Sequence, residues 1–199
     1  MAAVLDSVRA FLAPKTETAF RIDRENPGDV LARERLLDAA MGPNRRKKSS
    51  EAIRRDRVPA EGLALVARDE ASHVVGTVRL WNIQAGITPG GNAVPALLLG
   101  PLAVDSAHEG KGIGGALMRA AMLEAKKLGH GAILLVGDAP YYERFGFSTD
   151  KAMTLMMPGP FERHRFLGLE LKEGWLAGAA GIIVPTGRKL VDSATKKAA

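Results

Sequence analysis

The sequence predicts a single domain of mixed α/β architecture, and three observations support this prediction. Short β-rich runs alternate with amphipathic helical segments along the chain. A chain of 199 residues, 46% hydrophobic and 25% charged, is long enough for one compact core. No internal repeat divides the sequence. We therefore expect one mixed sheet with helices packed on it, and not two domains.

The N-terminal half should contain a strand, two helices and a hairpin. The first helix, at 31–41, should bury one face, and the MGPN sequence should end it. That face consists of Leu31, Leu36, Leu37, Ala40 and Met41. Ser49 or Ser50 could cap a short basic helix within 45–57. In order, the predicted elements are a strand at 15–22, a helix at 31–41, the basic helix, hairpin strands at 62–69 and 73–83, and a loop at 85–92.

The C-terminal half should begin with a long apolar strand at 93–104, which Gly100-Pro101 interrupts. The helix that follows should bury Ile113, Leu117, Ala120 and Ala121. Lys126 and Lys127 lie in its last turn and Gly129 follows, as is typical of a helix C-terminus. The remaining predicted elements are a buried strand at 132–138, a short helix at 139–145 ended by Gly146, and late strands at 165–171 and 181–187.

Composition excludes several classes of function. The chain has no cysteine, which rules out disulfides and thiolate chemistry. Its four histidines lack metal-ligand spacing, so we expect no metal. No apolar run approaches the ~18 residues of a membrane span, and the N-terminus does not resemble a signal peptide. We expect a cytoplasmic protein with an N-terminal extension at 1–14, one domain at 15–188 and a flexible tail at 189–199.

Four glycines, Gly110, Gly112, Gly114 and Gly115, lie directly before and within the start of the helix at 113–129. The first turn of a helix has free N–H groups and a partial positive charge, and glycines allow a phosphate to approach them. The segment is thus a candidate anion cradle. The alternative is a tight strand-to-helix turn without a ligand. The sequence context of a Rossmann fingerprint and the terminal Gly-Lys-Ser/Thr of a Walker loop are both absent.

The loop does not stand alone, because LGPLAVDSAHEGKGIGGALM followed by GDAPYYERFGF resembles the GNAT superfamily of acetyl-CoA-dependent N-acyltransferases. The resemblance is most specific over residues 94–147, and only the order of elements agrees over 16–93. The double tyrosine and PGPFERHRF look like a branch of predicted bacterial acetyltransferases without assigned substrates. The resemblance implies a mostly antiparallel twisted sheet with a splayed central strand pair and helices on both faces.

The resemblance also implies acetyl-CoA as cosubstrate and names the residues that would bind it. The pantetheine arm would pair with the strand beyond Pro101, and the pyrophosphate would lie on the glycine loop. These positions are Leu102, Ala103, Val104, Glu109, Gly110, Lys111, Gly112, Ile113, Gly114 and Gly115. Glu109 departs from the family pattern, which usually has Gln or Arg there. A carboxylate would repel a pyrophosphate unless it points to solvent or to Lys111.

Catalysis would need an acid and an oxyanion donor. Tyr142 matches the general-acid tyrosine of the family, five residues before Phe147, and Tyr141 is its competitor. The two side chains should diverge by ~100° on a helix, so that only one faces the sulfur. An N–H near Leu102 could stabilise the oxyanion. Proline at 101 fits a bulge where two strands part, or an ordinary edge strand.

The base and the acceptor stay open. From Ala93 to Val104 there is no titratable side chain, and Asp138 could be a base or the N-cap of the helix at 139–145. The basic run at 45–57 could be a solvated helix face, the border of an acceptor site favouring acidic or phosphorylated molecules, or an RNA contact. Trp81 could pack under the sheet or line the acceptor pocket.

The expected function is transfer of an acetyl group from acetyl-CoA to an amine of a small molecule or peptide. The alternative is a non-catalytic CoA-binding or nucleic-acid-associated module of the same fold. The net charge of +6 agrees with polyanionic partners of either kind, though nucleic acid is not favoured. Homodimerisation is common in the family, but no feature of the sequence establishes it.

Overall fold

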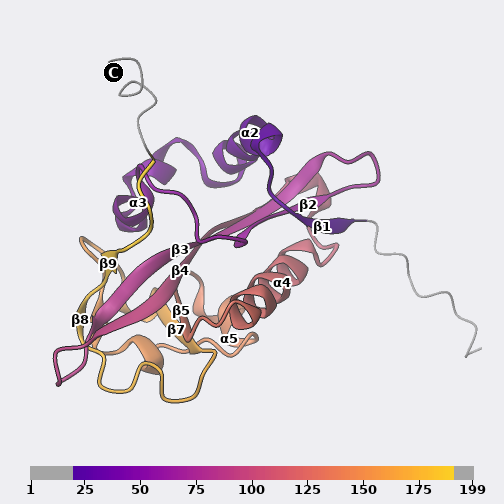
Figure 1. The fold of residues 1–199 in the computed structure, drawn as a ribbon. Helices are drawn as coiled ribbons and strands as arrows, with labels where there is room; N and C mark the ends of the chain where they lie inside the picture. The colour runs from indigo at the N-terminus through magenta and orange to yellow at the C-terminus, as the bar shows by residue number, and fades with distance from the viewer. Residues whose placement is uncertain (1–19, 191–199) are drawn as a thin grey trace, which may run out of the picture.

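The computed structural model describes residues 20–190, which form a twisted sheet with helices on both faces (Figure 1). The seven-stranded sheet has the order β1-β2-β3-β4-β5-β7, and β9 pairs with β3 outside this path. Within this sheet all pairs are antiparallel except β4 with β5, as expected of a mixed and mostly antiparallel sheet. The strands are β1 Arg21–Arg24, β2 Ala64–Arg68, β3 Val74–Ile87, β4 Ala93–Val104, β5 Ala132–Val136, β7 Phe166–Glu170 and β9 Val184–Pro185, with β6 Leu155–Met156 and β8 Gly181–Ile182 in a separate pair.

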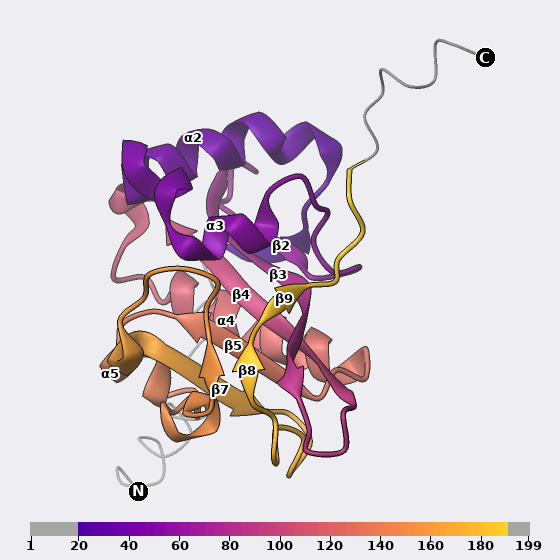
Figure 2. The same cartoon turned by 90° about the vertical axis from the view of Figure 1, so that its left-hand side faces the viewer.

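Helices α2 and α3 cover one face of the sheet, and α4 covers the other (Figures 1 and 2). The α4 face holds the larger core, in which Leu117 and Met118 meet buried residues of the central strands. On the opposite face, Ile53 of α3 joins a core built largely by the C-terminal third of the chain. The helical segments are η1 Pro27–Asp29, α2 Val30–Met41, η2 Pro43–Lys47, α3 Ser49–Arg54, η3 Ser106–His108, α4 Ile113–Lys127, α5 Ala139–Glu143, η4 Asp150–Ala152 and η5 Arg163–Arg165.

Helix α4 forms where the sequence predicts it. Its buried residues Ile113, Leu117, Met118, Ala121 and Ala125 recur at the helical period and form one apolar stripe. The helix begins after Gly112, which is left-handed with φ 79, and Gly129 follows its end with φ 84. Glycine tolerates positive φ where other residues are strained. The ends of the helix are therefore encoded locally.

Helix α2 differs from the prediction in the face that it buries. Leu36 and Leu37 are buried as expected, but Leu31 is 62% exposed and Ala40 is exposed as well. Arg33 is buried instead, because its guanidinium group pairs with the carboxylates of Glu25 and Glu34. An ion-paired arginine thus occupies a position that apolar periodicity cannot identify.

Three predicted boundaries are also wrong. The first strand, Arg21–Arg24, continues past its predicted end at residue 22; residues 15–19 of the prediction lie outside the described residues. Strand β3 continues to Ile87, through part of the predicted loop, because Ile87 pairs with Ala93 and forms an isolated bridge with Ala180. Neither serine caps α3, since its N-cap is Lys48 without a side-chain hydrogen bond.

The central strands β4 and β5 part as the resemblance implies. They pair only at Leu97–Ile133 and Leu98–Leu134. Beyond this point β4 has one extra residue relative to β3, a bulge at Gly100-Pro101, where the peptide bond is cis. After the bulge β4 stays with β3, while β5 stays with β7. The edge of β4 that faces β5 is therefore open from Leu99 to Val104.

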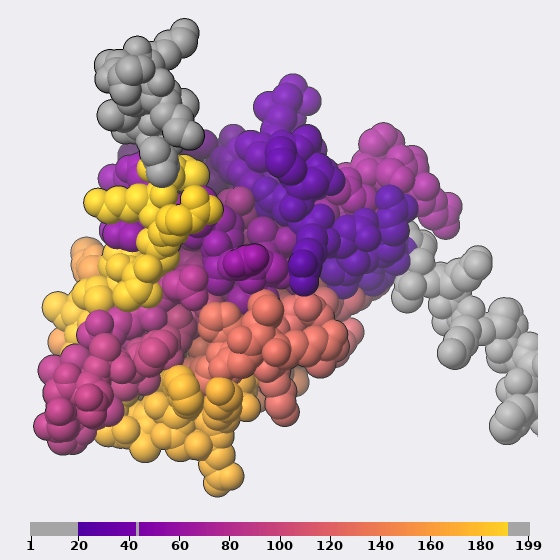
Figure 3. Space-filling view, in the orientation of Figure 1, coloured from indigo at the N-terminus to yellow at the C-terminus, as the bar shows by residue number. Residues whose placement is uncertain are grey.

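The C-terminal segment lies against the α3 side of the sheet. In Figure 3 the yellow segment runs between the purple α3 region and the magenta β3–β4 hairpin, in agreement with the pairing of β9 with β3. Lys189 forms an isolated bridge with Arg57. Residues 1–14 and most of the predicted tail lie outside the described residues, so the proposed domain limits stay predictions. Within residues 20–190, no helix has the length and apolar character to cross a membrane.

Candidate active site

A cavity of about 90 Å³ lies where β4 and β5 part. Pro101 and Leu102 line it from β4, Leu135 and Val136 from β5, and Tyr142 from α5. A second cavity, of about 110 Å³, lies toward α2 and β3. Both are lined by Met41, Arg45, Arg54 and Pro101, so they adjoin one another at the bulge. The gap between the strands thus adjoins a space beneath the helices α2 and α3.

Tyr142 reaches this gap because α5 follows β5 directly. A side chain at Gly137, the residue after β5, would collide with the Tyr142 ring, whose Cε2 lies 2.1 Å from the position of such a Cβ atom. The ring also contacts Phe147 edge-on, with the centroids 6.1 Å apart. Burial raises the pKa of the Tyr142 hydroxyl to about 12. The phenol is consequently protonated at neutral pH and able to donate a proton.

Tyr141 points in another direction. Its hydroxyl oxygen lies beside the first turn of α4, 2.9 Å from the position of a Cβ atom on Gly114. The rings of Tyr141 and Tyr142 meet edge-on with the centroids 4.9 Å apart, and the Arg144 guanidinium lies over the Tyr141 ring at 4.1 Å. Tyr142 lines the cavity between the strands, whereas Tyr141 faces the glycine loop.

The glycine loop has the shape of an open cradle. Gly110 and Gly112 have φ of 76 and 79, and a Cβ atom on either would meet no atom within 4 Å. The Ala116 N–H is bonded to the Gly112 carbonyl, so the N–H groups of residues 113–115 precede the hydrogen-bond ladder of the helix. Glu109 and Lys111 are exposed. These N–H groups and the positive end of α4 suit an anion.

The open edge of β4 presents main-chain groups to the gap. The Asp105 N–H donates to the Val75 carbonyl of β3 at 2.8 Å. Backbone groups alternate in direction along a strand, so Ala103 also faces β3, while Leu102 and Val104 direct theirs toward the open edge. An extended ligand lying in the gap can therefore pair with Leu102 and Val104 as an added strand would.

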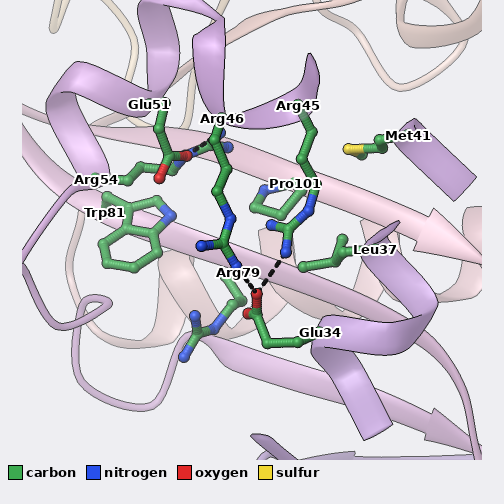
Figure 4. A pocket seen from close by; sticks show the side chains of 10 residues that line it. All are labelled: Glu34, Leu37, Met41, Arg45, Arg46, Glu51, Arg54, Arg79, Trp81 and Pro101. Atoms are coloured by element: carbon green, nitrogen blue, oxygen red, sulfur yellow. Dashed lines mark hydrogen bonds and ion pairs between the residues drawn. The ribbon is translucent and has the colours of Figure 1, made fainter. Parts of the chain in front are cut away.

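Trp81 and the basic run form the second cavity (Figure 4). The Trp81 side chain is buried, and its Nε1–H donates to the Gly100 carbonyl at 2.8 Å. Arg45 and Arg54 are only 10% and 11% exposed and line the cavity, so the basic run is not simply a solvated face. Arg46 is 67% exposed and reaches Glu34 from the rim.

The carboxylates near the gap differ in their ability to act as a general base. Burial opposes ionisation of Glu34, but hydrogen bonds from Arg45 and Arg33 prevail and lower its pKa to about 2. A carboxylate of such low pKa accepts a proton poorly. Asp138 is exposed and is the N-cap of α5, although its side chain makes no capping hydrogen bond. The base therefore has no assignment.

A family model for the acetyltransferase (GNAT) domain matches residues 60–149. The match covers β2 to α5, and hence the open strand edge, the glycine loop and both tyrosines. The chain thus contains a GNAT acetyltransferase domain.

Individual GNAT relatives agree with this assignment. The uncharacterized N-acetyltransferase YhbS of Escherichia coli K12 is 27% identical over 121 residues, which are 61% of this chain and 70% of the relative. The crystal structure of E. coli YhbS in complex with CoA has a TM-score of 0.71 at 25% identity, over 84% of this chain and 89% of that one. A GNAT acetyltransferase from Brucella melitensis in complex with acetyl-CoA has a TM-score of 0.56 at 25% identity, over 88% and 97% of the chains.

The structure also identifies residues of the site that the sequence prediction missed. Gly137 allows the Tyr142 ring to lie against the end of β5, and a glycine directly after a buried strand was the available signal. Glu34 organises the arginines of the second cavity, and nothing in the spacing of α2 indicates this role. Of the predicted residues, Leu102 and Tyr142 line the gap, Gly110 and Gly112 precede α4, and Gly114 and Gly115 lie in its first turn.

Proposed function

We propose that this GNAT domain transfers the acetyl group of acetyl-CoA to a primary amine by direct attack. The observation that carries the proposal is the convergence, at one gap in the sheet, of an open strand edge, an unobstructed glycine cradle and a partly buried, protonated tyrosine. Acetyl-CoA, when bound, supplies the activated acetyl group and a thiolate leaving group. The two relatives crystallised with CoA or acetyl-CoA support this choice of cosubstrate.

The residues of the chain divide into binding and chemical roles. Free N–H groups at 113–115 and the left-handed glycines before them would hold the pyrophosphate, with Glu109 directed to solvent. The main chain of Leu102 and Val104 would pair with the pantetheine arm and align it in the gap. The N–H near Leu102 would also stabilise the oxyanion, a contribution of ~3 kcal/mol for one donor.

In the chemical step, the amine nitrogen forms a bond to the thioester carbon and the carbon–sulfur bond breaks. The attacking amine is neutral, and the extra proton on the nitrogen of the tetrahedral intermediate passes to water, since no carboxylate lies on β4. Tyr142 gives its proton to the departing thiolate. The tyrosinate recovers a proton from solvent. The acceptor would approach through the second cavity, on the α2 and α3 side of the gap. The cytoplasmic location and homodimerisation stay predictions.

The test combines binding and turnover. Titration calorimetry with acetyl-CoA should show saturable binding, and free thiol should appear with at least one member of an amine panel faster than without amine. Binding without amine-dependent thiol release would favour the non-catalytic module. Absence of acetyl-CoA binding would reject both the acetyltransferase and the non-catalytic CoA-binding module.

A further inference from the structure

The second cavity has an unequal balance of charge. Arg45, Arg46, Arg54 and Arg79 line it together with only two carboxylates, Glu34 and Glu51. Further carboxylates lie behind the lining: Asp38 pairs with Arg45, and Glu25 pairs with Arg79. Glu34, however, is shared among three guanidinium groups, because it also pairs with Arg33, and Glu25 is shared between two. Positive charge thus exceeds negative charge around the cavity.

Among the described residues, Arg54 has a single compensating carboxylate, that of Glu51. Its side chain is 11% exposed, and its one hydrogen bond to another described residue is donated to Glu51 at 2.9 Å. A guanidinium group carries five N–H donors, so most of those on Arg54 have no acceptor among residues 20–190. Burial also lowers the pKa of Arg54, which indicates that the charge is incompletely stabilised by its neighbours. An anion in the cavity would supply the missing hydrogen-bond acceptors and negative charge.

Arg54 also lies at the point where an acceptor must meet the acetyl group. It lines both cavities, and its Nη1 lies 3.5 Å from the position of a Cβ atom on Gly100, in the β4 bulge. Gly100 is held there by the hydrogen bond from Trp81. Leu102, the proposed pantetheine partner, follows two residues later. The two cavities are small, so an acceptor that fits them must be a small molecule. Its anionic group would then be only a few bonds from the attacking nitrogen.

We propose that the acceptor is a small amine that also carries an anionic group, a carboxylate or a phosphate, and that Arg54, with Arg46 at the rim, binds this anion and orients the amine toward the gap. The inference rests on the proposed acetyl transfer and specifies its substrate class. A guanidinium group suits either anion, because its planar donors match both geometries. Arg54 is therefore a specificity-determining residue.

The test compares acceptors with and without an anionic group, with kcat/KM expressed per neutral amine so that the differing amine pKa values do not enter. The common L-amino acids are assayed against their α-amides, and 2-aminoethyl phosphate against ethanolamine, by thiol release from acetyl-CoA at low salt. In at least one of the two series, kcat/KM should be ~10-fold or more higher for the anionic acceptors than for their neutral partners. This is the scale of one hydrogen bond to a charged group. The series that is preferred identifies the anion. Equal rates for charged and neutral partners would overturn the proposal while leaving acetyl transfer intact.

Variants assign the preference to a residue. Arg54→Gln should lower kcat/KM for the anionic acceptors ~10-fold or more and leave kcat/KM for the neutral acceptors nearly unchanged. For the anionic acceptors, kcat/KM of Arg54→Lys should lie between the values of the parent and of Arg54→Gln. Arg55→Gln removes the same charge from an exposed side chain at the end of the same helix and should change neither series. The acetyl-CoA affinity of each variant serves as a check of folding. A proportional loss for both series in Arg54→Gln would contradict the role of Arg54.

A binding measurement keeps the inference testable if no amine is acetylated. The thermal midpoint of the protein saturated with CoA is measured with each amino acid and with its amide. Stabilisation by a charged ligand that is lost in Arg54→Gln would support an anion site even though acetyl transfer fails. Absence of any charge-dependent stabilisation together with absence of turnover would overturn the anion site as well.

Discussion

The Tyr141 hydroxyl oxygen lies 2.9 Å from the position that a Cβ atom on Gly114 would occupy. This close approach joins α5 to the first turn of α4, two helices that β5 separates in the sequence and that flank the proposed cofactor site. Gly114 lacks a positive φ, so the backbone alone would accept alanine, and alanine normally favours a helix. The requirement for glycine here comes from the neighbouring tyrosine.

Gly114→Ala should therefore weaken acetyl-CoA binding by displacing Tyr141 and the start of α4, and Tyr141→Phe should rescue it by removing the colliding oxygen. A coupling of ~1–3 kcal/mol between the two substitutions is expected for residues in contact. Calorimetric affinities of the two single variants and of the double variant measure it. Additive effects would show that Tyr141 does not mediate the requirement for glycine.

Tyr142→Phe removes the proposed proton donor and retains the ring that lies against Gly137. We expect kcat to fall ~10²-fold or more, the scale of a positioned general acid, with little change in the dissociation constant of acetyl-CoA. Tyr141→Phe is the matched control, since its hydroxyl faces the loop rather than the gap, and its effect on kcat should be the smaller. Near-wild-type kcat in both variants would mean that the thiolate leaves without a protein acid.

The pH dependence should reflect the raised pKa of Tyr142. With a pKa raised from 10.0 to about 12 by burial, the phenol stays protonated throughout the neutral and mildly alkaline range. The kcat/KM should rise with pH as the acceptor amine loses its proton, and should not fall through ionisation of Tyr142 below pH 10.0. An alkaline fall below that pH that is present in the parent and absent in Tyr142→Phe would contradict the burial argument.

The same shift bears on stability. The unfolded chain would release the tyrosine proton at lower pH than the folded one, so the contribution of Tyr142 is fully present below pH 10.0 and is lost as the pH rises from there to about 12. The thermal midpoint of the parent should consequently decline more steeply over this range than that of Tyr142→Phe. Parallel declines would show that the hydroxyl titrates normally.

Glu109→Gln should bind acetyl-CoA as well as the parent or a few-fold more tightly. The exposed carboxylate beside the cradle would repel a pyrophosphate weakly, and salt would screen the effect. Calorimetry at low and high salt measures it, and Glu70→Gln removes the same charge from the exposed β2–β3 hairpin as a control. A large loss of affinity in Glu109→Gln alone would reveal a structural role for the carboxylate.

Glu34→Gln should destabilise the fold at neutral pH by ~1–3 kcal/mol, because it leaves Arg33 and Arg45 without their shared acceptor. The pKa of Glu34 is lowered from 4.5 to about 2, so its contribution is present above pH 4.5 and is lost as the pH falls toward 2. The difference in thermal midpoint from the parent should narrow over that range. Glu61→Gln, at an exposed position, should show no such convergence.

The sequence by itself determined the features that depend on local chemistry. Helix α4 begins after left-handed Gly112 and buries one stripe, because backbone strain and apolar periodicity act over a few neighbouring residues. The β2–β3 hairpin, the long strand β4 and the short helix α5 are encoded in the same way. The motif around the glycines and tyrosines was therefore sufficient to predict the family and the parting of β4 from β5.

Only the tertiary structure decided which side chains meet. Arg33 is buried and Leu31 exposed because carboxylates from two elements surround the arginine, a balance that apolar periodicity does not contain. Tyr141 and Tyr142 are adjacent in sequence, yet one faces Gly114 and the other the gap, because α4 and β5 approach α5 from different sides. The excess of positive charge around the second cavity likewise arises from residues on η2, α3 and β3 that the fold brings together, since charge compensation depends on distances through space and not along the chain.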